Sequence, residues 1–131
     1  MIYLDTSVAL AHLLGETLRP PATLWDETLI ASRLLQYELM CRVNGRGLST
    51  SHGEDARQLV GRVALVELAP VVLERALEHF PFVVRTLDAI HLATMAFLRS
   101  QGHALRLASY DDRLLAGAAS LGVPALDGLN A

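Results

Sequence analysis

The sequence predicts an α/β domain built on a parallel β-sheet. Short apolar runs that suit buried strands alternate with longer segments of helical periodicity, the pattern of strand–helix–strand units. Glycine and proline residues stand at the boundaries between these segments. The chain of 131 residues contains no repeat, low-complexity segment or linker, so we expect one domain over residues 1–131.

The N-terminal third predicts two strands, each followed by a helix. Residues 1–4 form an apolar run that suits a buried strand, and the polar residues after it suit the N-cap of a helix over 8–14. Gly15 is expected to end that helix. A second strand is expected at residues 28–31, with Ser32 as the N-cap of the helix that follows.

Three further strands and two further helices follow from the same patterns. The segment 51–60 starts with a capping-box pattern, which predicts a helix with its N-cap at the first serine. A strand is expected at 63–68 and a helix at 70–80, where proline suits the first helical position. Apolar runs predict the last two strands at 105–109 and 123–126.

Residues 86–97 predict a helix that is apolar on nearly every side and is therefore buried between other elements. Its first turn carries Asp88, and His91 lies one turn later on the same face. Asp88 has two interpretations, a charge that complements the helix dipole or a ligand for a metal ion. For His91 we expect a buried supporting role more than a metal ligand.

Four acids from separate segments are expected to meet at one edge of the sheet. Asp5 follows the first strand, and Asp111 follows the strand at 105–109. Glu38 lies in the helix after the second strand, and Asp88 begins a helix whose N-terminus faces the same edge. Ligands of open parallel sheets bind outside the carboxyl ends of the strands, which is this edge.

Each acid also has an ordinary structural interpretation. Asp5 suits a turn or an N-cap, Glu38 a solvated helix position, and Asp111 an N-cap with Asp112 in the first turn after it. Together, however, closely spaced carboxylates must take up protons or hold cations. Oxygen ligands without a His or Cys cluster favour Mg²⁺ or Mn²⁺ over Zn²⁺.

Composition excludes several other classes. All 11 basic residues are arginines, so a P-loop, which needs lysine, is absent. The net charge of −3 decides little about nucleic acid, because two bound divalent cations add four positive charges. No apolar run is long enough to span a bilayer, and the N-terminus lacks the basic lead-in of a signal peptide, so we expect no membrane partner.

Cys41 is the only cysteine, which excludes an intrachain disulfide and favours a cytoplasmic location. We expect it to pack as a small apolar residue. The long apolar helix and the face of residues 8–14 offer more apolar surface than a small sheet covers. We therefore expect a homodimer, or a partner protein lying across such a groove.

Four blocks of sequence, at residues 1–7, 32–38, 85–94 and 108–114, together resemble the PIN-domain family, and within it the VapC-type toxins of bacterial toxin–antitoxin pairs. The resemblance implies a three-layer α/β/α sandwich with a five-stranded parallel sheet. It also implies an Mg²⁺- or Mn²⁺-dependent endoribonuclease that is commonly dimeric and is inhibited by a cognate antitoxin protein.

The family's acidic residues fall on Asp5, Glu38, Asp88 and Asp111. The resemblance implies that the three aspartates are the principal metal ligands and that the glutamate holds or orients metal-bound water. It also implies that Thr6 positions the first aspartate, or the substrate phosphate, through its hydroxyl or backbone NH.

The resemblance leaves some positions open. Ser109 matches a small polar position that supports the site, and Asp112 is an alternative to Asp111 as the fourth acid. Arg85 and Arg113 flank the acids and have two interpretations, contacts to substrate phosphates or ion pairs with neighbouring carboxylates.

Two other functions share these features. One is a non-catalytic module that keeps the acidic pocket to bind a cation or a partner. The other is a metal-dependent phosphatase or DNA nuclease, since the metal chemistry is common to RNA and DNA cleavage. The preference for RNA comes from the resemblance.

Overall fold

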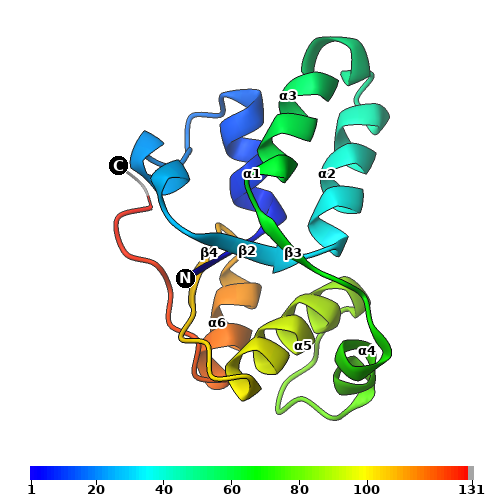
Figure 1. Cartoon of the computed structure of the whole chain (residues 1–131), viewed down its shortest axis with the longest axis vertical. Helices are drawn as coiled ribbons and strands as arrows, with labels where there is room; N and C mark the ends of the chain where they lie inside the picture. The colour runs from blue at the N-terminus through cyan, green and yellow to red at the C-terminus, as the bar shows by residue number, and fades with distance from the viewer. Residues whose placement is uncertain (130–131) are drawn as a thin grey trace.

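The computed structural model describes residues 1–129 and contains a parallel sheet with helices on both faces (Figure 1). The last two residues of the predicted domain, 130 and 131, lie outside the described part. The elements in chain order are β1 (Ile2–Leu4), α1 (Thr6–Leu14), η1 (Ala22–Asp26), β2 (Leu29–Ser32), α2 (Leu34–Gly45), α3 (Ser49–Gly61), β3 (Ala64–Val66), α4 (Pro70–Leu77), α5 (Thr86–Ser100), β4 (Arg106–Ala108) and α6 (Asp112–Ser120).

The expected three-layer α/β/α sandwich is confirmed. Helices α1, α2 and α3 cover one face of the sheet, and α4, α5 and α6 lie on the other (Figure 1). Neighbouring strand residues point to opposite faces. Ile2 and Leu4 of β1 therefore belong to the apolar core under α1 and α2, whereas Tyr3 belongs to the core under α5.

The sheet has four strands in the order β3-β2-β1-β4, so the expectation of five is wrong. The segment 123–126 pairs with β4 only through one bridge, between Leu107 and Ala125. Leu107 donates to the carbonyl of Pro124 at 2.8 Å, and Leu126 donates to Leu107 O at 2.8 Å. Proline has no NH to extend this ladder, so the segment stops at a single bridge.

The capping box predicted for α3 is also wrong. The helix begins at Ser49, with Leu48 at the N-cap position and no side-chain cap. Ser51 lies inside the helix, where its hydroxyl donates to the carbonyl of Leu48 at 3.3 Å. Glu54 pairs with Arg57 on the exposed surface. The tight turn after α2 starts α3 before the serine that the pattern favoured.

Helix α5 has the burial that its composition predicts. Its buried residues face the sheet and the helices beside it, and they are Ala89, His91, Leu92, Ala93, Thr94, Met95 and Leu98. The apolar face of α1 is covered as well, because α1 packs against α2 and α3. The apolar surface that we expected the sheet to leave uncovered is therefore covered within the chain, by α2 and α3. Among the described residues, no helix combines the length and apolar character that a membrane crossing requires.

We expect Leu92→Ala to destabilise the protein by about 2–5 kcal/mol, because Leu92 is 1% exposed and truncation leaves a cavity between α5 and the sheet. Urea denaturation measures this loss. Leu18→Ala is the control, since Leu18 is 50% exposed and should lose much less. Equal losses in the two variants would contradict the placement of α5.

Candidate active site

One pocket of about 670 Å³ is lined by all four predicted acids. Asp5 directly follows β1, and Asp111 is the N-cap of α6 just beyond β4. Glu38 projects from the second turn of α2, and Asp88 lies in the first turn of α5. Because every strand of the sheet is parallel, these segments reach the same edge.

Asp5 is 7% exposed and is held by two serine hydroxyls. Its Oδ2 accepts from Ser7 Oγ at 2.6 Å and from Ser109 Oγ at 2.8 Å. Ser109 Oγ also accepts from the backbone NH of Asp111 at 2.9 Å, so it connects two of the acids. The sequence pointed to Ser109 but not to Ser7, whose hydroxyl additionally accepts from the NH of Tyr110 at 3.0 Å.

Glu38 is fixed by two side chains that both donate to its Oε1. Thr6 Oγ1 lies 2.9 Å away and His91 Nε2 lies 2.6 Å away. One interpretation of the resemblance was that the hydroxyl of Thr6 positions Asp5. In the structure this hydroxyl contacts Glu38 instead. Burial alone favours a higher pKa for Glu38, but the bonds from His91 and Thr6 and the charge of Arg42 outweigh it and lower the pKa.

A buried chain of hydrogen bonds orients His91, which is 2% exposed. The hydroxyl of Tyr3 accepts from the NH of Ser32 at 3.1 Å and lies 2.7 Å from His91 Nδ1. Burial raises the pKa of Tyr3, so the phenol stays protonated and donates its proton to Nδ1. With Nδ1 accepting from Tyr3, His91 donates from Nε2 to Glu38. The expected supporting role of His91 fits this arrangement.

Asp88 differs from the other acids because no side-chain hydrogen bond or ion pair to it occurs among residues 1–129. Burial is the largest cause of the raised pKa of Asp88, and the charges of Asp111 and Asp5 raise it further. Asp111 uses only Oδ1 to cap α6, accepting from the NH groups of Arg113 and Leu114 at 2.9 and 3.3 Å. Asp112 is exposed and does not line the pocket, which favours Asp111 as the fourth acid.

The structure separates the two arginines that the sequence grouped together. Arg85 lines the acidic pocket, whereas Arg113 does not. Four residues of α2 that the sequence did not single out for the site also line it, namely Leu34, Tyr37, Cys41 and Arg42. Their positions next to Glu38, or three to four residues from it on the same helix, could have indicated that they line the site.

Cys41 is exposed, so the expectation that it packs as a small apolar residue is wrong. It lies on the pocket side of α2, and the core positions of this part of the helix belong to Leu39 and Val43. Helical spacing explains the difference, because a residue three positions after Glu38 shares its face.

The acids line the pocket without forming a closed ligand set. No group of three or more His, Cys, Asp or Glu side chains within residues 1–129 is arranged to hold an ion. Asp5 and Asp111 are each turned partly toward donors of the chain. Even so, no arginine or histidine in this part of the chain pairs with Asp5, Asp88 or Asp111. Several carboxylate oxygens without a basic partner suit a hard divalent cation such as Mg²⁺ or Mn²⁺.

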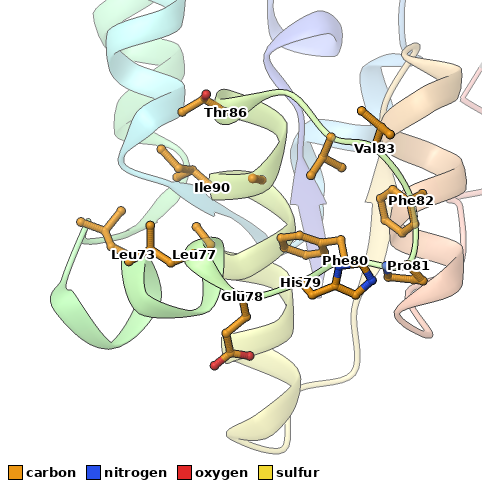
Figure 2. Close-up of a pocket in the computed structure, with 13 residues that line it drawn as sticks. Leu73, Leu77, Glu78, His79, Phe80, Pro81, Phe82, Val83, Thr86 and Ile90 are labelled. Atoms are coloured by element: carbon orange, nitrogen blue, oxygen red, sulfur yellow. The ribbon is translucent and has the colours of Figure 1, made fainter.

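A larger hollow of about 820 Å³ lies between α4, the 78–84 loop and α5, apart from the acids (Figure 2). Its lining is mainly apolar and includes Leu73, Leu77, Phe80, Phe82, Val83 and Ile90. Leu77 is 87% exposed, and Val83, which also lines the hollow, is fully exposed. This apolar groove shares only Thr86 with the lining of the acidic pocket.

Comparison with known proteins identifies a family and two curated relatives. The PIN domain family model matches residues 2–119. Ribonuclease VapC47 of Mycobacterium tuberculosis (strain CDC 1551 / Oshkosh) is 33% identical over 129 residues, covering 93% of each chain. Ribonuclease VapC46 of M. tuberculosis (strain ATCC 25618 / H37Rv) is 37% identical over 95 residues, covering 72% of this chain and 69% of that relative.

Solved structures share the fold at lower sequence identity. The crystal structure of M. tuberculosis VapC20, described as a sarcin–ricin loop cleaving toxin, has a TM-score of 0.65 at 18% identity and covers 88% of this chain and 94% of that one. A toxin–antitoxin complex from Klebsiella pneumoniae has a TM-score of 0.57 at 14% identity, covering 86% and 89%. With a family model that matches nearly its whole length and with VapC proteins among its relatives, the chain belongs to the PIN-domain family.

Proposed function

We propose that this protein is a VapC-type endoribonuclease that hydrolyses RNA phosphodiester bonds at a site loaded with Mg²⁺ or Mn²⁺. The observation that carries the proposal is the pocket into which four segments bring Asp5, Glu38, Asp88 and Asp111. Three of these acids have no basic partner among the described residues. The names of the curated relatives supply the choice of RNA.

In this proposal Asp5, Asp88 and Asp111 hold the cation. A bound divalent ion lowers the pKa of its water and stabilises charge on the attacked phosphate. Ser7 and Ser109 fix one oxygen of Asp5, which leaves Oδ1 for the ion. In Asp111, likewise, only Oδ1 caps α6, which leaves Oδ2 for the ion.

Glu38 orients the attacking water. Thr6 and His91 both occupy Oε1, so Oε2 remains for a further hydrogen bond. The lowered pKa of Glu38 keeps the carboxylate ionised near neutral pH, as a hydrogen-bond acceptor requires. The buried Tyr3–His91 pair keeps the glutamate in one position.

Two other functions remain as outcomes of experiment, a metal-dependent DNA nuclease or phosphatase and a non-catalytic module that binds a cation or a partner. We further propose a cytoplasmic location and inhibition by a cognate antitoxin. One of the solved structures with this fold is a toxin–antitoxin complex, which supports the second part of that proposal.

Labelled RNA should be cleaved in Mg²⁺ or Mn²⁺, and EDTA should abolish the cleavage. Matched single-stranded DNA should be cleaved far more slowly. Asp5→Asn should reduce RNA cleavage to background, because it removes a charged ligand while an amide oxygen still accepts from the serines. Preferential cleavage of DNA, or full activity in EDTA, would overturn the assignment.

We expect metal-free Asp88→Asn to be more stable than the wild type at neutral pH. The pKa of Asp88 is raised in the folded state, so between the ordinary carboxyl pKa and this raised pKa the folded state binds more protons than the unfolded state. The stability of the wild type therefore falls as pH rises through this range. The advantage of Asp88→Asn should therefore vanish below the ordinary carboxyl pKa. Urea denaturation in EDTA across pH measures it.

The matched control for this measurement is Asp127→Asn, because Asp127 is exposed and does not line the acidic pocket. Its stability should follow that of the wild type across pH. Added Mg²⁺ should reverse the order and stabilise the wild type over Asp88→Asn, since ligands that bind only the folded state stabilise it. A destabilised metal-free Asp88→Asn at neutral pH would show that the carboxylate has a structural role.

We propose that the apolar groove between α4 and α5 joins two copies of the chain (Figure 2). A two-fold interface uses the same patch on both subunits, so the patch must offer both a projection and a hollow. The exposed side chains of Leu77 and Val83 project beside the groove that they help to line.

Leu77→Glu should convert a dimer into a monomer, because it places a charge in an apolar contact. Light scattering coupled to gel filtration measures the mass. The control is Val71→Glu, since Val71 is 57% exposed on the same helix but does not line the groove. A wild-type monomer at micromolar concentration would refute the dimer.

A further inference from the structure

We propose that Tyr37 is a stacking platform for one base of single-stranded RNA, and that Arg42 and Arg85 beside it bind the adjoining phosphates. This inference rests on the proposed ribonuclease function and adds to it a determinant for unpaired substrate. The two arginines and the tyrosine line the same pocket as the acids.

The ring of Tyr37 is available for stacking. Tyr37 precedes Glu38 on α2, and the residue is 62% exposed although its side chain is large and aromatic. Within residues 1–129 it takes part in none of the aromatic pairs and not in the cation–π contact, which involve other side chains. An exposed aromatic ring at the edge of a charged pocket suits a nucleobase, because every base has a π-face.

Arg42 and Arg85 supply positive charge on two sides of this pocket. Arg42 lies one turn after Glu38 on α2, and Arg85 is the N-cap residue of α5. Both are exposed, and neither forms an ion pair in the described part of the chain. A guanidinium without a carboxylate partner is suited to the planar, two-point binding of phosphate.

Helical spacing brings these groups into one surface. Tyr37 and Cys41 form one i, i+4 pair on α2, and Glu38 and Arg42 form the neighbouring pair. A strand whose phosphate enters among the acids therefore meets an aromatic ring and a guanidinium on the same helix. In a duplex the bases already stack on each other, so only an unpaired base can use the ring.

The test is the affinity of a short fluorescein-labelled single-stranded RNA, measured by anisotropy with Ca²⁺ in place of Mg²⁺ to limit cleavage. Tyr37→Ala should weaken binding by about five- to 150-fold, whereas Tyr37→Phe, which keeps the ring, should bind as the wild type does. Affinity for a duplex of the same sequence should not change with Tyr37→Ala.

The salt dependence of binding distinguishes the arginines from the ring. Arg42→Gln and Arg85→Gln should each reduce the slope of log affinity against log salt by about 0.7, the value for one phosphate contact on a single strand. Tyr37→Ala should leave this slope unchanged. Arg46→Gln is the matched control, because Arg46 is exposed at the end of the same helix and does not line the pocket.

Unchanged affinity of a Tyr37→Ala variant that melts like the wild type would overturn the inference. So would equal weakening for single-stranded and duplex RNA, or a defect confined to binding of an antitoxin. In each of these cases the wild type still cleaves RNA. A wild type that neither binds nor cleaves RNA marks failure of the proposed function itself, which is a different result.

Discussion

Repulsion among carboxylates gathered at one edge of the sheet is the constraint on which the rest of this structure depends. Unit charges about 4 Å apart repel by about 4 kcal/mol at an effective dielectric near 20, so a group of acids must be offset by its surroundings. The protein supplies donors for some oxygens, through Ser7 and Ser109 to Asp5 and through Thr6 and His91 to Glu38. Asp88 receives no such bond among the described residues, and burial first, with the charges of Asp111 and Asp5 in addition, raises its pKa.

The fold places this charge where it can be used. Parallel strands bring Asp5 and Asp111 to one edge, and α5 must begin at that edge to return beneath the sheet. The buried bonds from Ser32 through Tyr3 to His91 then run from the sheet into the site. The interior of the sandwich therefore fixes Glu38, although that residue belongs to a helix on the other face.

Much of this arrangement could be predicted from sequence because it follows from local pattern. The apolar runs before Asp5 and Asp111 identified strand ends, and the apolar character of α5 predicted its burial around Asp88. The contact between Thr6 and Glu38 could not be predicted, since it depends on how α1 and α2 pack. The same is true of Tyr3 and His91, which lie 88 residues apart in sequence. The prediction of a fifth strand was wrong because of one residue, Pro124, whose missing NH limits the pairing with β4 to a single bridge.

The most direct measurement is a crystal structure of the protein with Mn²⁺, in which anomalous scattering locates the ion. Our proposal predicts manganese between the carboxylates of Asp5, Asp88 and Asp111, with Glu38 still bonded to Thr6 and His91. Manganese bound only elsewhere on the surface at saturating concentration would contradict the claim that these acids form a metal site.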